Sequence, residues 1–189
     1  DYNICTSCGM CNKVCQINYV LKGENKRPKK NLVAISRIKD IWKSAASGGV
    51  AGTFAAYAVN NMNALVFGCI LNENIVAEHI SITKSCENEM IQGSKYVQNN
   101  IDNAYKIALI ALQHEQNVLF FGTPCQIAGL QNFLGKKYAK LITVDHVCHG
   151  VPSPSFLKNA LTTMLSKAIS NCLSLEARLE FLEVTVSIA

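Results

Sequence analysis

Four cysteines near the start of the chain have the spacing of metal-cluster ligands. Cys5, Cys8, Cys11 and Cys15 form a C-x2-C-x2-C-x3-C run. In this pattern the thiolates of one tightly curled loop converge on an iron–sulfur cluster. Gly9 lies between the second and third cysteines, where the backbone must pass close to such a cluster. The run therefore predicts a 4Fe-4S cluster and electron-transfer chemistry.

Zinc and disulfides are the alternatives for these thiols. Zinc sites are usually built from two separated ligand pairs rather than one compact run. Disulfide frameworks are typical of small secreted domains, and the sequence shows no secretory signal pattern. Gln16 stands where the ferredoxin pattern usually has proline. In two-cluster ferredoxins the fourth cysteine of each run ligates the other cluster. Cys15 would then complete a second cluster whose own run lies upstream, which leaves the fourth ligand of the first cluster open.

The composition predicts an ordinary globular protein. The 189 residues are 49% hydrophobic and carry a formal charge of +5, enough for one good core and a small additional lobe. Since no apolar run is long enough to cross a bilayer, we expect a cytoplasmic protein with reduced thiols. The basic stretch 22–30 is interpreted as a solvated linker, because Gly23 and Pro28 break structure and no aromatic residues are interleaved for stacking on bases. We therefore expect no nucleic-acid partner.

Apolar strands and amphipathic helices alternate after the linker. This order predicts an α/β fold, with α+β possible, in which helices flank a mixed or parallel sheet. A small ferredoxin-like cysteine lobe precedes it. Helices are expected over residues 50–59, 101–112, 124–134 and 153–167, and strands over residues 64–70, 75–82, 117–121 and 141–147, with a possible short strand at 31–35.

Two glycine-containing loops could bind a phosphate or a planar cofactor. The first, residues 47–49, precedes a helix, whose free amides and positive dipole end attract anions. The second, residues 93–96, combines a cation, a hydroxyl group and an aromatic ring. At both places an ordinary turn is the alternative.

A third loop, residues 122–126, follows the strand NVLFF directly. Ligands of α/β folds bind at the carboxyl ends of the strands. Cys125 in this loop and Cys148 after the next strand are therefore candidate metal ligands at one edge of the sheet. A cysteine–histidine hydrolase is the rival interpretation, with Cys125 as nucleophile and His146 or His149 as base.

Taken together, four segments resemble the beta-subunit family of coenzyme F420 hydrogenase/dehydrogenase. They are SAASGGVAGTFAAYAV, IQGSKYVQN, VLFFGTPCQIAGLQNFL and LITVDHVCHGVPSP, in that order. The resemblance covers roughly residues 40 to 158. The cysteine run extends it, because it looks like the second run of the two-cluster ferredoxin domain that precedes many family members.

The resemblance implies an iron–sulfur flavoprotein that passes electrons between FAD and 4Fe-4S clusters. It also implies a redox partner protein or subunit and a small-molecule electron or hydride carrier. On this interpretation Cys125 and Cys148 are ligands of a further cluster beside the flavin. The candidate cofactor-binding residues are Ser47, Gly48, Gly49, Gly93, Ser94, Lys95 and Thr123.

The expected organisation has four parts. Residues 1–20 are a partial ferredoxin-type segment, 21–40 the basic linker, 41–168 the flavin and iron–sulfur N-terminal domain of the beta subunit, and 169–189 a tail. Family members continue well beyond VCHGVPSP, whereas we expect no resemblance from about residue 169. A truncated, inactive remnant and a zinc-stabilised interaction module therefore remain alternative functions.

Overall fold

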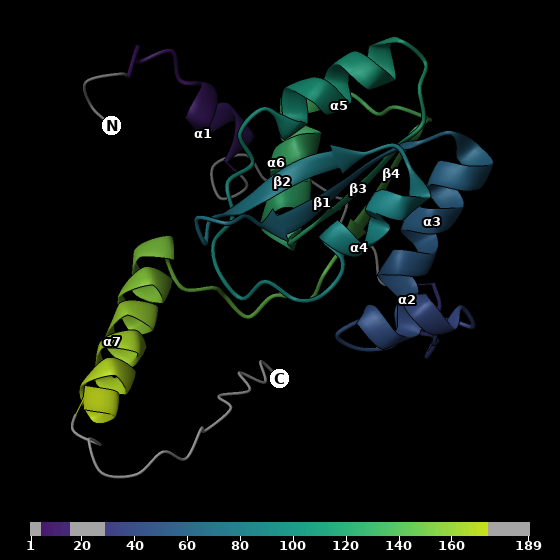
Figure 1. Cartoon of the computed structure of the whole chain (residues 1–189). Coiled ribbons are helices and arrows are strands. Elements are labelled where there is room, and N and C mark those ends of the chain that lie inside the picture. Colours follow the sequence, from purple (N-terminus) through teal and green to yellow (C-terminus); the bar gives the residue numbers. More distant parts are fainter. Residues whose placement is uncertain (1–4, 16–28, 174–189) are drawn as a thin grey trace.

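The computed structural model describes residues 5–15 and 29–173 (Figure 1). At its centre is one mixed sheet with the strand order β2-β1-β3-β4, flanked by helices, which confirms the expected α/β class. The strands are β1 (Leu65–Leu71), β2 (Ala77–Ile82), β3 (Val118–Gly122) and β4 (Leu141–Asp145). Residues 1–4, 16–28 and 174–189 lie outside the described residues, and with them the first part of the expected linker and most of the expected tail.

The strand directions bring several loops to one edge of the sheet. β1 pairs antiparallel with β2, so that Cys69 lies opposite His79. β1, β3 and β4 are parallel to one another. Their carboxyl ends therefore share one edge, called here the carboxyl edge. The loops that follow β3 and β4 begin there.

The two faces of the sheet each carry an apolar core. Phe67 and Phe120 point to the face covered by α5 (Ala104–Gln113) and α6 (Pro124–Leu134), and their rings stack at 5.1 Å. Val66 and Leu119 point to the opposite face, which is covered by α3 (Val50–Met62). This alternation follows from the two-residue period of a strand, and it explains why β1 and β3 are apolar at consecutive positions.

The connections place three helix N-termini at the carboxyl edge. α3 leads back into the start of β1, and α5 leads back into the start of β3, so both helices begin at that edge. α6 starts two residues after β3 ends. The remaining helices are α1 (Met10–Val14), α2 (Lys39–Ser44), η1 (Ser85–Glu87), α4 (Asn88–Ile91) and α7 (Pro154–Leu173).

The prediction of a short strand at residues 31–35 is wrong. This segment has no strand pairing and lies instead against the glycine loop before α3. The amide of Ser36 donates to the carbonyl of Gly48 at 2.7 Å, and a Cβ on Gly48 would lie 2.6 Å from the carbonyl oxygen of Ala34. The short helices α2 and α4 lacked a recognisable pattern in the sequence.

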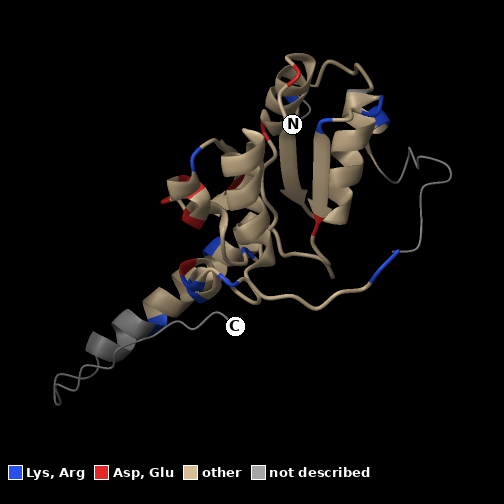
Figure 2. Ribbon diagram, turned by 90° about the vertical axis from the view of Figure 1, so that its right-hand side faces the viewer, with Lys and Arg blue, Asp and Glu red and all other residues tan. Residues whose placement is uncertain are grey.

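Some element boundaries differ from the expected ones for local reasons. The side chain of Asn72 accepts from the amides of Asn74 and Val76, both at 3.0 Å, and this turn delays β2 until Ala77. α7 begins as predicted, since the hydroxyl of Ser153 accepts from the amide of Phe156 at 3.3 Å. It continues to Leu173 and projects away from the sheet (Figures 1 and 2). None of the described helices is long and apolar enough to span a membrane.

Candidate functional site at the carboxyl edge

The first glycine loop forms the N-terminus of α3 at the carboxyl edge. Gly49 has φ of 72°, a left-handed conformation that a residue with a side chain adopts only at a cost. Gly48 allows the loop to approach the backbone of residues 34 and 35 closely. The first amides of α3 are thus available at the point where the sequence predicts a phosphate-binding loop.

The second loop leaves α4 beside the first turns of α3. A Cβ on Gly52 would lie 3.0 Å from the side chain of Gln92, so residues 92 and 52 are in close contact. Gly93 follows with φ of 77°. The ammonium group of Lys95 folds back and donates to the carbonyl of Gln92 at 2.5 Å. Burial lowers the pKa of Lys95, and the nearby Cys69 opposes this shift.

The third loop is the turn of residues 122–125 between β3 and α6, called here the strand-end turn. Pro124 occupies the first helical position of α6. The amide of Thr123 donates to the side-chain oxygen of Gln126 at 2.9 Å. The hydroxyl of Thr123 lies 3.0 Å from the sulfur of Cys125, which is exposed. The turn therefore presents a hydroxyl and a thiol side by side at the carboxyl edge.

Polar side chains that the sequence analysis missed lie behind this turn. His79 contacts the carbonyl of Phe121 at 2.8 Å and the side-chain amide of Asn99 at 2.5 Å. The hydroxyl of Tyr105 donates to the carbonyl of Gln126 at 2.7 Å. Burial raises the pKa of Tyr105 to about 12, with a smaller contribution from Cys125. No single motif marks these residues, because they come from β2, α5 and the segment after α4.

Cys69 belongs to the same region, although its apolar strand sequence suggests an ordinary core thiol. It is half-buried, and burial raises the pKa of its thiol. A hydrogen bond with Asn99 and the charge of Lys95 oppose that shift. Cys69 is thus in contact with the polar groups behind the strand-end turn.

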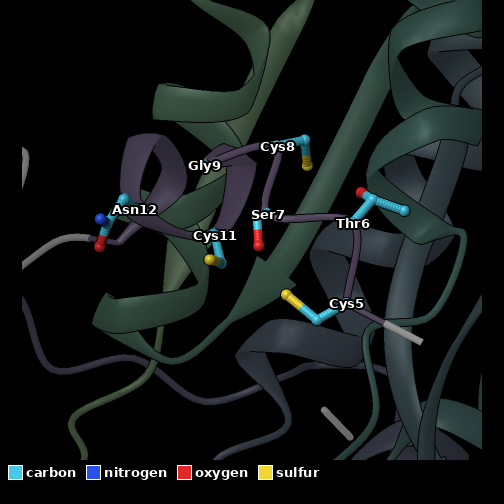
Figure 3. A pocket seen from close by; sticks show the side chains of 7 residues that line it. All are labelled: Cys5, Thr6, Ser7, Cys8, Gly9, Cys11 and Asn12. Atoms are coloured by element: carbon cyan, nitrogen blue, oxygen red, sulfur yellow. The ribbon is translucent and has the colours of Figure 1, made fainter. Parts of the chain in front are cut away.

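Three of the four N-terminal cysteines line a hollow of about 480 Å³ on the loop of residues 5–15, called here the cysteine loop. The fourth, Cys15, is half-buried and does not line it. Figure 3 shows the side chains of Cys5, Cys8 and Cys11 around it, with Ser7 between them. α1, in the second half of this loop, lies alongside α6. The donor set of thiols on one curled, exposed loop fits an iron–sulfur cluster in chemistry. Within residues 5–15 and 29–173, however, no three His, Cys, Asp or Glu side chains are gathered closely enough to hold a metal ion.

The loop after β4 carries the other predicted ligand. Cys148 is half-buried, and its sulfur accepts from the amide of Gly150 at 3.4 Å. The ring of His146 stacks on Phe121 at 6.0 Å. In the described part of the chain, the hydrogen bond of the Cys125 sulfur goes to Thr123 and none goes to a histidine. The hydrolase interpretation therefore gains no support from this geometry.

Comparisons with known proteins agree with this fold. The family model for the C terminus of the coenzyme F420 hydrogenase/dehydrogenase beta subunit matches residues 115–186. A chain in the xenon-derivatised structure of the F420-reducing NiFe hydrogenase complex from Methanosarcina barkeri has a similar fold, with a TM-score of 0.51 and 19% sequence identity. No curated protein matches the sequence.

Each of the two matches covers only part of the chain. The structural match covers 66% of this chain and 45% of the hydrogenase chain, so the present chain spans less than half the length of that neighbour, and at this identity the likeness shows the fold alone. The beta-subunit match reaches residue 186. Our expectation that the resemblance ends near residue 169 is therefore wrong: the tail has no periodic pattern, but a family model does not depend on periodicity. The division at residues 168 and 169 stays a prediction.

Proposed function

We propose that this chain is an electron-transfer subunit or domain of an oxidoreductase that passes electrons between FAD and 4Fe-4S clusters. The observation that carries the proposal is the position of α1 alongside α6. α6 begins at the strand-end turn, so one helix connects the cysteine loop to the candidate flavin site. Short separations between redox groups are what an electron-transfer protein has to provide.

The flavin would lie across the carboxyl edge. The free amides at the start of α3, next to Gly48 and Gly49, suit its phosphates, because a helix N-terminus favours negative charge. Lys95 adds a cation from the second loop, and Thr123 adds a hydroxyl group from the third. A bound flavin would exchange two electrons with a hydride carrier and release them one at a time.

The clusters would be held by thiolates. Cys5, Cys8, Cys11 and Cys15 are the proposed ligands on the cysteine loop. Cys125 and Cys148, which follow β3 and β4, are proposed for a further cluster at the carboxyl edge. Their side chains would have to move closer together when a cluster binds, as is common when a metal site forms only with its metal.

A partner protein or subunit is supported by an exposed apolar surface. It is formed by the segment 32–42 and by the outward side chains of α3, and large exposed apolar surfaces commonly mark interaction sites. The exposed side chains include Leu32, Val33, Ile35, Trp42, Phe54 and Tyr57. We propose that a redox partner covers this surface, as the similar hydrogenase chain belongs to a complex of several components.

Anaerobic reconstitution with iron, sulfide and FAD tests the proposed function. We expect at least one 4Fe-4S cluster and one FAD per chain, with loss of iron in Cys8→Ser and Cys11→Ser. Cys86→Ser is the matched control, because Cys86 is also exposed but belongs to no cysteine run. Zinc without acid-labile sulfide would support the interaction module instead. No flavin and less than one cluster in folded protein would support the inactive remnant.

A further inference from the structure

A chain of hydrogen bonds links β2 to the strand-end turn through three side chains. At one end, the amide of Thr123 donates to the side-chain oxygen of Gln126 at 2.9 Å. At the other end, the Nε2 atom of His79 lies 2.8 Å from the carbonyl oxygen of Phe121. Both terminal partners are backbone groups whose roles as donor and acceptor are fixed. They flank Gly122, so the chain closes on the turn from both sides.

These two ends determine which side-chain atom of Gln126, Asn99 and His79 is the donor and which is the acceptor in each hydrogen bond. Because the Gln126 oxygen accepts from Thr123, the Gln126 NH2 group donates to the Asn99 side-chain oxygen. The Asn99 NH2 group then donates to Nδ1 of His79 at 2.5 Å. His79 must therefore accept at Nδ1 and carry its proton at Nε2, which is the proton that the Phe121 carbonyl accepts. Working inward from Phe121 gives the same assignment, so every donor faces an acceptor.

We propose that Asn99 is a positioning residue for the strand-end turn. Its carboxamide is the only part of this chain of bonds that contacts both Gln126 and His79. His79 and Gln126 are 9% and 8% exposed, so water cannot readily replace a lost partner, and a buried polar group without a partner is costly. Asn99 thereby fixes the Gln126 carboxamide that holds the Thr123 amide, and with it the direction of the Thr123 hydroxyl and the Cys125 thiol.

The arrangement couples the protonation of His79 to the turn. A proton on Nδ1 would place a donor against the Asn99 NH2 group. Asn99 would then have to rotate its amide, which would set its NH2 group against that of Gln126. The titratable or charged groups that surround this region are Cys69 and Glu78 on neighbouring strand positions, Lys95 before Asn99, Tyr105 on α5, Cys125 on α6 and His146 after β4.

The substitution Gln126→Glu tests the relay. The new carboxylate still accepts from Thr123 but cannot donate to Asn99. Asn99 should therefore rotate, donate to the carboxylate and point its oxygen at Nδ1 of His79, which then holds a proton. We expect the protonated fraction of His79 near neutral pH to rise about tenfold or more, measured by NMR of the imidazole ring in the full chain.

A double variant separates the relay from the direct effect of the new charge. In Asn99→Leu/Gln126→Glu the carboxylate remains but no carboxamide connects it to His79. The relay predicts that most of the increase in protonated His79 disappears. An increase of the same size in the double variant would overturn the proposal. Asn99→Ala/Gln126→Glu replaces it if the leucine variant does not fold, because alanine also removes the carboxamide and the same loss is then expected.

The reactivity of the Cys125 thiol reports the conformation of the strand-end turn. We expect the alkylation rate of Cys125, followed by peptide mapping, to change about threefold or more in Asn99→Leu and in Asn99→Asp. Gln98→Leu is the matched control, since Gln98 is exposed and adjacent, and its side chain donates to the Asn99 backbone carbonyl at 3.5 Å rather than to the carboxamide. The alkylation rate of Cys125 in this variant should not change, nor should that of the exposed Cys86. Unchanged His79 titration and unchanged Cys125 reactivity in both Asn99 variants would refute the positioning role.

The inference rests on the proposed function only in giving the strand-end turn a role at a cofactor site. The measurements use the chain without cofactors, so a failure to bind iron or FAD leaves their outcome unaffected. Conversely, a chain that binds both cofactors but shows no coupling between Asn99, His79 and Cys125 would retain the proposed function and lose the inference.

Discussion

Asn99 and Gln126 are joined side chain to side chain across 27 positions of the sequence. The contact ties the segment that follows α4 to the first turn of α6. The segment that continues the second loop is therefore held to the start of α6 rather than only to the sheet. A preorganised first turn of this kind is what a binding site needs if its polar groups are to meet a ligand in a fixed direction.

His79 makes folding stability depend on pH. Burial lowers the pKa of His79 below its usual value of 6.5. Because the folded state binds this proton less readily than the unfolded state, stability should fall as the pH drops below about 6.5. We expect the free energy of unfolding to decrease from pH 7 towards pH 5 in urea titrations. In His79→Gln the decrease should be smaller, whereas His114→Gln, on an exposed residue, should keep it. An unchanged slope in His79→Gln would contradict this assignment.

The hydroxyl of Tyr105 should lose its proton only at high pH, and its hydrogen bond should stabilise the start of α6. Its pKa is raised to about 12, chiefly by burial. Since the folded state disfavours the tyrosinate, stability should fall as the pH rises above about 10, the usual pKa of the group. Tyr105→Phe removes the hydrogen bond to the carbonyl of Gln126 and should cost about 1 kcal/mol. Spectrophotometric titration should show one tyrosine fewer in the latest step, and titration of all tyrosines near pH 10 would disprove the burial effect.

Gly48 is required by close backbone contact rather than by its φ angle. In Gly48→Ala the new Cβ would lie 2.6 Å from the carbonyl oxygen of Ala34, so the loop before α3 has to shift. We expect a loss of about 1–3 kcal/mol in urea unfolding and weaker FAD binding. Gly135→Ala is the control: it has φ of 66° but no atom within 4 Å of the new Cβ, so its cost should be about 1–2 kcal/mol with FAD binding unchanged. Equal effects of the two variants on FAD binding would argue against a role for Gly48 in that site.

Phe120 is the central side chain of the α5/α6 core. It is fully buried and stacks on Phe67 at 5.1 Å and on His79 at 5.2 Å. Phe120→Ala should destabilise the protein by about 3–5 kcal/mol, because it loses apolar burial and leaves a cavity. Phe54→Ala, on an α3 side chain that is 50% exposed, should cost less than about 1 kcal/mol. Thermal unfolding distinguishes the two, and similar midpoints would contradict the assigned core.

The sequence predicts the sheet well because its strands are short apolar runs with clear ends. Pro124 and the preceding strand NVLFF locate the start of α6 correctly. The strand predicted at residues 31–35 is absent for a physical reason. The apolar residues of this segment suggest a strand, but its backbone packs closely against Gly48 in the loop before α3. Strand propensity reports a side chain's fit to a half-buried surface, and it carries no information about a distant loop.

The site is only partly readable from the sequence for a similar reason. Glycine loops and cysteines have recognisable local patterns, and three of these loops do meet at the carboxyl edge. His79, Asn99 and Gln126 have no such pattern, because their function depends on contacts between β2, the segment after α4 and α6. The sheet register places His79 opposite Cys69, and backbone hydrogen bonds from Asn100 to β2 bring the neighbouring Asn99 beside it.

The central claim is that the cysteine loop holds a cluster that accepts electrons. The most direct measurement is the electron paramagnetic resonance spectrum of the anaerobically reconstituted chain before and after chemical reduction. We expect a signal of a reduced 4Fe-4S cluster in the wild type and in Cys86→Ser, and its loss or marked change in Cys11→Ser. Folded, oxygen-protected protein that gives no cluster signal on reduction would contradict the claim.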